Sequence, residues 1–394
     1  MLEYVQKRLG QVADSLIEPV WKKLLASPWW LRVLFLLLIV PIAYGFYSPK
    51  EAVSGWRLTT ALARVAAASG PALPLSPALR SKARDVAKLI AGSLQSDINE
   101  PTKAHINPWV MSQDVLATSF ASSSRDSKRI AAFMRANADV PCACWRAEPE
   151  NAGTAHVIFI SGWVLATLGQ IGERADPASV DFLLSEQSHD GWWSMYPVAP
   201  DSLYASSYTT AWALLGLKGQ LSLIPAQDKA KDEVSAAIQK ASAWLLSQRE
   251  SGSRWKDYPL ISIGKVSVSI SGVVIHALHQ TVDDRLRLVD TEWLDALPSN
   301  PVLVSDSDHH DLWFQARGAR VNDSWVQAQL PWMLVATADA YPHGNLWQRA
   351  RALQWVEQEL SRPELDAADT LADNWWRAEL LFSLEYLLAT SSRA

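Results

Sequence analysis

An internal repeat constrains the fold of this chain more than any other feature of its sequence. The segment Met111–Thr118 recurs in a similar form as Ile160–Thr167. Looser copies begin at positions 207, 270, 323 and 374, so the copies follow one another at roughly 50 to 60 residues. Each opens with small or polar residues suited to a helix N-cap and continues as an almost wholly apolar run. This pattern is typical of helices that are buried on all sides.

More polar, amphipathic stretches lie between these copies. They span residues 78–95, 125–138, 176–187, 228–248, 285–296 and 345–360. Buried and amphipathic helices therefore alternate. An apolar inner layer that closes into a ring has no terminal helix with an uncovered apolar face. The alternating run at 266–271 is the one strand-like signal, but it lies where an inner helix should begin and has no partner strand. The pattern predicts an all-α domain, an (α/α)6 toroid of six helical hairpins.

The charge balance excludes one class of partner. The chain has 36 Lys and Arg against 41 Asp and Glu, which gives a formal charge of −5. No basic surplus is left to hold a phosphate backbone, so we expect no nucleic-acid partner. Tryptophan is unusually frequent, with 20 residues, and 17 of them follow position 50. The excess therefore belongs to the main domain and needs a structural or ligand-binding cause.

The amino end has the features of a membrane anchor. Residues 29–47 contain a single charge, Arg32, and nineteen helical residues span about the 30 Å of a hydrocarbon core. Tryptophans at the start of this stretch and tyrosines near its end are typical of the two membrane interfaces. We expect an amphipathic segment at 1–28, a transmembrane helix at 29–47, a linker at 48–77 and the toroid at 78–394.

Basic residues are somewhat more numerous before the expected span than after it. This bias favours a single-pass membrane protein with its amino end in the cytoplasm and its toroid outside. The opposite orientation stays open, because the difference is small. In either case the lipid bilayer is an expected partner.

The end of one predicted outer helix carries a motif. Phe182 and an aliphatic residue are followed, after three residues, by Gln187, and then by Gly191 and Trp193. Gly191 can end the helix, the Gln187 amide can bond carbonyls freed there, and Trp193 can pack across the joint. This arrangement resembles the QW motif of the superfamily of terpene cyclases and protein prenyltransferases.

Further segments carry the same resemblance. Less complete copies of the motif end at Trp145 and Trp255. The segment Ser207–Leu214 is similar to the S-x-x-T-A-W-A-L inner-helix start of squalene and hopene cyclases. Together these segments cover about residues 125–360. The resemblance implies the toroid fold, whereas a QW motif is a structural clasp and implies no particular chemistry.

The catalytic acid motif of the cyclases is missing at the start of the inner helix where the resemblance would place it. These enzymes protonate an alkene or epoxide with a D-x-D-D-T-A motif at the start of an inner helix. If Thr210 and Ala211 are set on the T-A of this motif, residues 206–209 contain no carboxylate, and the D-D-x-x-D motif is also missing. We therefore expect a chain that is not an enzyme, with catalysis as the alternative.

Cys142 and Cys144 raise the question of a metal, because the prenyltransferases bind zinc through Asp, Cys and His. Asp139 and His156 are close in sequence, but C-x-C lacks the spacings that favour tetrahedral zinc. Two small residues in a hairpin turn are the simpler interpretation, and a disulfide is an alternative outside the cytoplasm. We expect no metal and no cofactor.

Candidate site residues fall into two groups. Asp308 and His309, in the polar loop before the fifth inner helix, and Asp323, at the start of that helix, are the candidates for catalysis. Aromatic and polar side chains on the inner helices are the candidates for lining a ligand cavity, although core packing explains them as well. They are Trp163, Tyr208, Trp212, His276, Trp325, Trp332 and Trp376.

These observations favour a membrane-anchored, non-catalytic toroid that binds a partner protein or an apolar small molecule at its cavity. The alternative is a single-domain enzyme of isoprenoid or lipid metabolism, similar to a cyclase or prenyltransferase, whose acids have moved to residues 306–311. A carbohydrate-active barrel is a third interpretation, and it requires two carboxylates that face each other across the cavity. A cavity filled by the chain's own tryptophans would oppose every function that needs a ligand.

Overall fold

A computed structural model gives the fold of most of the chain. It describes residues 49–68, 70–99, 108–118, 124–146, 156–197, 202–260, 266–281, 285–298, 306–310, 324–327, 329–370 and 374–391. Contacts divide the chain into two units, Met1–Ala67 and Ala68–Ala394. The described part of the first unit is helix α3 (Pro49–Ala67) and the second is a helical ring. The expected segments at 1–28 and 29–47 lie outside the described residues, and no described helix is long and apolar enough to span a bilayer.

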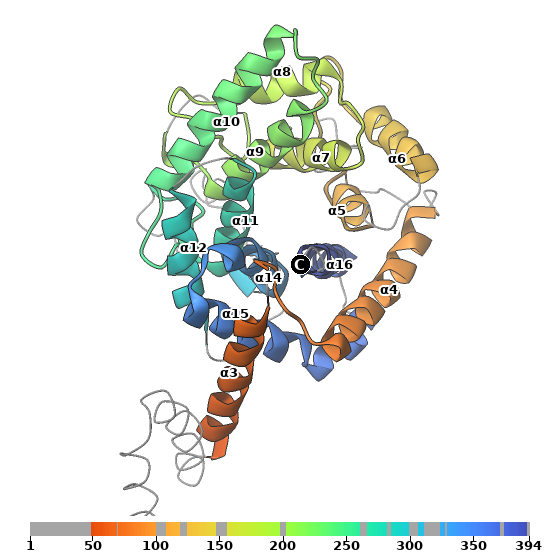
Figure 1. Cartoon of the computed structure of the whole chain (residues 1–394). Helices are drawn as coiled ribbons and strands as arrows, with labels where there is room; N and C mark the ends of the chain where they lie inside the picture. The colour runs from red at the N-terminus through yellow and green to blue at the C-terminus, as the bar shows by residue number, and fades with distance from the viewer. Residues whose placement is uncertain are drawn as a thin grey trace, which may run out of the picture. The chain divides into compact units, whose positions relative to one another are not determined.

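The inner helices form a closed ring. They are α5 (Pro108–Thr118), α7 (Ile158–Gln170), α9 (Ser207–Leu221), α11 (Val268–His279), α14 (Gln329–Ala340) and α16 (Asn374–Ser391). Each of these helices contacts the next one, and α16 contacts α5 (Figure 1). Their side chains are buried on nearly every face, because neighbouring inner helices and an outer helix surround each of them. The described residues are mostly helical, as the sequence predicted.

The outer helices surround this ring in Figure 1. They are α4 (Pro77–Asn99), α6 (Ser124–Ala136), α8 (Pro177–Glu186), α10 (Lys229–Ser247), α12 (Leu286–Asp295) and α15 (Leu346–Leu360). Three begin at side-chain caps, since Asp176, Asp228 and Asn345 accept hydrogen bonds from backbone N–H groups of the first turn. Short 3-10 helices lie at η1 (Ser202–Tyr204), η2 (Tyr341–His343) and η3 (Pro363–Thr370).

Glycines allow neighbouring inner helices to pack very closely. A Cβ atom on Gly162 of α7 would lie 2.6 Å from the carbonyl carbon of Trp212 on α9. On the same face a Cβ on Gly216 would lie 2.7 Å from the carbonyl oxygen of Gly162. In the same way, a Cβ on Gly272 of α11 would lie 2.5 Å from the carbonyl oxygen of Trp332 on α14. These helix pairs therefore pack backbone against backbone.

Three tryptophans join an outer helix to the next inner helix with the same pair of hydrogen bonds. The indole N–H of Trp193 donates to the carbonyl of Leu183 at 2.7 Å, and its backbone N–H donates to the hydroxyl of Thr210 at 3.0 Å. Trp145 and Trp255 repeat both bonds, each to a carbonyl of the preceding outer helix and to a serine hydroxyl of the following inner helix. These bonds set the distance between the two helices of a hairpin.

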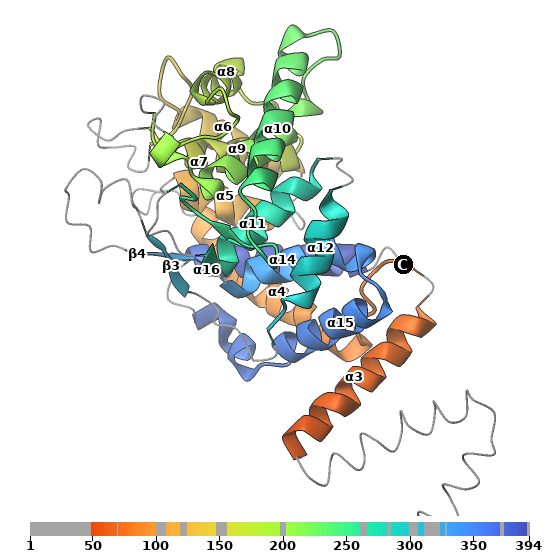
Figure 2. The same ribbon diagram turned by 90° about the vertical axis from the view of Figure 1, so that its left-hand side faces the viewer.

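Two short antiparallel ribbons were not expected. Strand β1 (Trp255–Lys256) pairs with β2 (Val266–Ser267), so the expectation that the run at 266–271 has no partner was wrong. Only Val266 and Ser267 of that run form a strand, and residues 268–271 begin α11, where the sequence placed the start of an inner helix. Strands β3 (Asp306–His310) and β4 (Ser324–Gln327) form the second ribbon, at one side of the ring in Figure 2.

This second ribbon corrects the placement of Trp325. The sequence placed this residue on the fifth inner helix, whereas it lies on β4, and α14 begins only at Gln329. Proline is tolerated in the first turn of a helix, where its missing N–H has no helical partner. Pro331 is therefore compatible with a helix that begins at Gln329, but it would break a helix that began at Asp323, six residues earlier.

Candidate functional site

The middle of the ring is filled by aromatic side chains. Trp163 and Trp212 stack with their ring centroids 3.4 Å apart, and Trp332 meets Trp212 edge-on at 5.4 Å. Tyr208 packs against Trp212, also edge-on, at 6.3 Å. All four residues are buried. These side chains form an aromatic core in the ring.

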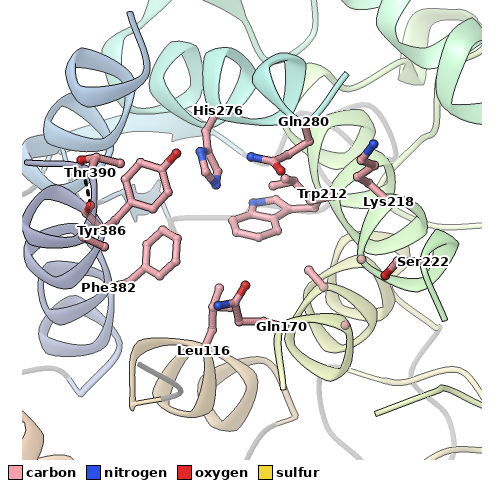
Figure 3. A pocket seen from close by; sticks show the side chains of 15 residues that line it. Leu116, Gln170, Trp212, Lys218, Ser222, His276, Gln280, Phe382, Tyr386 and Thr390 are labelled. Carbon is pink, nitrogen blue, oxygen red and sulfur yellow. Dashed lines mark hydrogen bonds between the residues drawn. The ribbon is translucent and has the colours of Figure 1, made fainter. Parts of the chain in front are cut away.

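A cavity of about 410 Å³ remains at one end of the ring. Most of its lining comes from the C-terminal halves of α5, α7, α9, α11 and α16, and Trp212 contributes from the middle of α9 (Figure 3). Leu116, Trp212 and Phe382 supply apolar surface, while Gln170 and Lys218 supply polar groups. The cavity thus combines an aromatic wall with a polar rim, as small-molecule sites do.

One wall of the cavity holds a buried hydrogen-bonded network. His276 and Tyr386 both line the cavity, and Asp339 lies behind them. The Asp339 carboxylate accepts a hydrogen bond from Nδ1 of His276 at 2.9 Å and another from the hydroxyl of Tyr386. A neutral His276 that donates from Nδ1 keeps Nε2 as an acceptor. The network therefore fixes the orientation of the imidazole at the cavity wall.

The described residues that line the cavity supply positive and donor groups but no carboxylate. Neither Asp nor Glu is among the described residues that line it. Lys218 is half-buried, and among the described residues no carboxylate forms an ion pair with it. The indole N–H of Trp212 is buried and has no acceptor among these residues. Because buried donors are seldom left unpaired, the Trp212 N–H is suited to an acceptor atom of a ligand.

An unusual acid lies in the core, away from the cavity lining. The Glu379 carboxylate of α16 accepts hydrogen bonds from the amide of Gln113 at 2.9 Å and the indole of Trp332 at 2.8 Å. Burial raises the pKa of Glu379 to about 8, although these two bonds act in the opposite direction. Glu379 is therefore a neutral carboxylic acid near pH 7, enclosed by the core.

The structure separates the residues that the sequence proposed as ligand-binding. Trp212 and His276 line the cavity. Trp163, Tyr208 and Trp332 belong to the aromatic core, outside the lining.

The other candidates are also outside the described lining. Trp376 is half-buried near the start of α16. Trp325 lies opposite His309 in the register of β4 and β3, and Asp308 is also on β3, while Asp323 falls outside the described residues.

Sequence reasoning missed several residues of the cavity because it concentrated on the starts of the inner helices. Lys218 and Gln280 lie at the ends of helices that are otherwise almost wholly apolar. Phe382, Tyr386 and Thr390 follow at intervals of four, which places them on one face of α16. A polar residue at the end of each buried helix was the available signal.

One missed carboxylate has a structural role. Asp257 comes two residues after Trp255 in the sequence, and in the fold its side chain lies beside the N-terminus of α9. Its carboxylate accepts bonds from the hydroxyl of Ser206 at 2.6 Å and the backbone N–H of Tyr208 at 3.1 Å. Asp257 therefore caps α9 together with Ser206.

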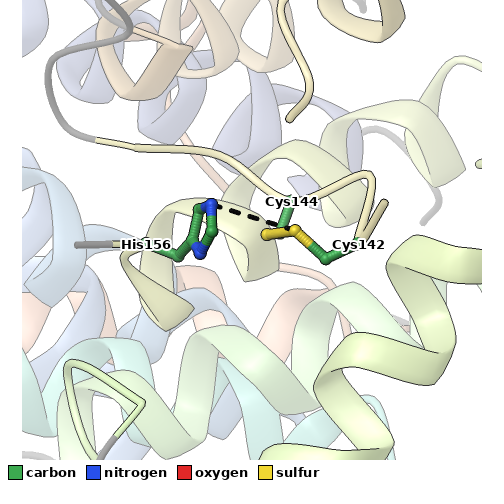
Figure 4. Close-up of side chains that lie close together, drawn as sticks. All are labelled: Cys142, Cys144 and His156. Carbon is green, nitrogen blue, oxygen red and sulfur yellow. Dashed lines mark hydrogen bonds between the residues drawn. A yellow bond between two sulfur atoms is a disulfide. The ribbon is translucent and has the colours of Figure 1, made fainter. Parts of the chain in front are cut away.

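The two cysteines form a disulfide in the joint between α6 and α7. The Cys142–Cys144 bond lies beside His156, whose Nε2 is 3.9 Å from the sulfur of Cys142 (Figure 4). The same Nε2 is 2.8 Å from the carboxylate of Asp139, which also pairs with Arg146. In the oxidised form the sulfurs are bonded to each other and are not available as thiolate ligands.

Comparisons with known proteins find similarity in solved structures. Two of them are variants of the type II terpene cyclase MstE from Scytonema in complex with geranylgeranyl dihydroxybenzoate, its substrate. One covers 79% of this chain and 99% of its own, with 12% identity and a TM-score of 0.46. The other covers 80% and 100%, with 12% identity and a TM-score of 0.47.

These structures come from the family that the sequence motifs resemble. A likeness at this identity and TM-score carries nothing about the function of this chain. No protein-family model matches the sequence, and no curated protein sequence matches it.

Proposed function

We propose that this chain is a membrane-anchored, non-catalytic ring that binds a small amphipathic molecule in the cavity at the C-terminal ends of its inner helices. The observation that carries this proposal is the composition of the cavity lining, where the described residues supply aromatic surface, Lys218 and His276 but no carboxylate. The ligand has an apolar body that packs on Trp212 and Phe382 and an anionic head, a carboxylate or a phosphate, that pairs with Lys218.

Electrostatics favour an anionic head. A half-buried ammonium group without a carboxylate partner is only partly compensated by water, and an anion would compensate it more fully. The buried N–H of Trp212 supplies a second donor. A volume of about 410 Å³ is within the range of small-molecule sites.

The same lining supports a binding function over catalysis. Protonation of an alkene requires a strong acid exposed to the substrate, and two carboxylates would be needed for glycoside hydrolysis. Glu379 is neutral near pH 7, but it has two hydrogen-bonded partners in the core and does not line the cavity. The anchor at 29–47 would hold the ring beside a bilayer, where amphipathic molecules partition.

The test is ligand binding to Lys218→Glu. We expect the purified chain to bind a long-chain carboxylate or an isoprenoid phosphate, measured by calorimetry. The variant should bind the same probe at least about tenfold more weakly, because a charged hydrogen bond is replaced by like-charge repulsion. Lys240→Glu, on the exposed face of α10, makes the same charge change away from the cavity and should bind as the parent does. The proposal would be contradicted if Lys218→Glu and Lys240→Glu bound the probe equally well. It would also be contradicted if neither the parent chain nor Lys240→Glu bound the probe.

A second function is supported by the network behind the cavity. Nε2 of His276 is an acceptor that Asp339 orients, as a general base requires. The alternative is therefore an enzyme that processes isoprenoids or lipids. Chromatography and fragment-ion analysis of the probe extracted after incubation with the chain separate the two functions, because a cyclised product has the same mass as its substrate. A probe recovered with its original structure supports the binding function, and a chemically altered probe that His276→Gln no longer forms supports the enzyme.

A further inference from the structure

Two histidines and a buried aspartate form a cluster that is separate from the described lining of the cavity. His279 is the last residue of α11, Asp290 lies in α12 and His343 ends η2. Nε2 of His279 is 2.7 Å from one carboxylate oxygen of Asp290, and Nδ1 of His343 contacts the other. The two imidazoles are nearly parallel, with centroids 5.7 Å apart. Three different elements of the ring therefore bring three side chains to one point.

We propose that His279, Asp290 and His343 bind one divalent transition-metal ion, such as Zn²⁺ or Co²⁺. Their three candidate ligand atoms all lie within 4.8 Å of one another. Two imidazole nitrogens and a carboxylate oxygen suit these borderline ions better than Mg²⁺ or Ca²⁺, which prefer oxygen ligands.

The charges around Asp290 support a cation. This carboxylate has no exposed surface, and among the described residues its ion-pair partners are the two histidines, with no Lys or Arg. A buried carboxylate needs positive charge nearby. A metal ion would provide that charge while keeping both histidines as ligands.

The geometry allows an ion to enter and to keep an open position. His343 is 45% exposed, so the cluster is reached from solvent. Tetrahedral coordination with bonds of about 2.0 Å places ligand atoms about 3.3 Å apart. His279 and His343, which both contact Asp290 directly, would therefore each move away from its carboxylate to admit the ion. With three protein ligands, the fourth position would be left to water or to an exogenous ligand.

The test is Co²⁺ titration of the full chain without a purification tag. Bound Co²⁺ should give a saturable visible absorption band at one ion per chain, and Zn²⁺ should displace it. His343→Ala, at a partly exposed position, should lose the band and the rise in unfolding temperature that Zn²⁺ causes. Asp290→Asn provides a second variant of nearly the same size, whose fold is checked by circular dichroism.

The matched control is His156→Ala, which removes a histidine beside the disulfide. It should keep the band, because the reagents are used without reductant and the cysteines stay paired. No saturable band in the parent chain, or an equal band in folded His343→Ala, would overturn the proposal. Neither result depends on whether the cavity binds an amphipathic molecule.

Discussion

Replacing Gly162 with alanine is expected to destabilise the ring by about 3 kcal/mol or more, at the upper end of what an extra methyl group costs in a packed core. The new Cβ would lie within 2.8 Å of three backbone atoms of Trp212 and Ala213. Because these atoms belong to the backbone of α9, no side-chain rotation can relieve the overlap, and α7 and α9 must separate. Urea or thermal unfolding followed by circular dichroism measures the loss.

Gly92→Ala is the control for this prediction. Gly92 lies away from both ends of α4 and is exposed to solvent, and a Cβ there would meet nothing within 4 Å. Alanine should stabilise that helix by roughly 0.5 to 1 kcal/mol, because glycine loses more backbone freedom on folding. If both variants unfolded at the same denaturant concentration, the close approach of α7 and α9 would be refuted.

The effect of Gly162→Ala should extend to the cavity. Trp163 follows Gly162, and it stacks on Trp212, which lines the cavity. Separation of the two helices would break this stack and move the aromatic wall. A ring that stays folded in this variant should therefore bind the amphipathic probe more weakly than the parent does.

The sequence predicted the helices well because burial alone determines their pattern. An inner helix surrounded by other helices must be apolar on all faces, and this is visible in Ile158–Gln170 without any knowledge of its neighbours. The outer stretch predicted at 228–248 is observed as Lys229–Ser247, because Asp228 marks its start as a cap. Such signals are local, and one sequence is enough to find them.

The sites depend on contacts that a single sequence does not reveal. His343 lies 53 residues from Asp290, and Asp339 lies 63 residues from His276, so no spacing rule connects them. Trp212 and Trp332 have similar sequence surroundings, yet only Trp212 lines the cavity. The difference arises from position along the ring axis, which is set by how the helices pack against one another.

Removing the charge of Glu379 is expected to change how the stability of the ring depends on pH. The unfolded carboxyl titrates at about 4.5, whereas burial raises the pKa in the ring to about 8. Between these values the folded chain binds more protons than the unfolded chain, so its free energy of unfolding falls as the pH rises. At about 1.4 kcal/mol for each pH unit, this group should lower stability by about 3 to 4 kcal/mol from pH 5 to pH 9.

The variant Glu379→Gln should lack this contribution. Its carbonyl can accept from the indole of Trp332, and its amide can donate to Oε1 of Gln113, which has no donor among the described residues. We therefore expect a variant within about 1 kcal/mol of the parent at pH 5 and more stable by a few kcal/mol at pH 9. Unfolding in urea at a series of pH values measures both chains.

A matched variant separates this effect from the loss of one negative charge. Glu233→Gln makes the same change on the exposed face of α10 and should follow the pH dependence of the parent. If Glu379→Gln also followed the parent curve, Glu379 would have to be ionised in the ring, with a compensating positive charge close to it. Among the described residues the carboxylate is bonded to Gln113 and Trp332, which are both neutral, so the raised pKa and the flat curve of the variant are expected together.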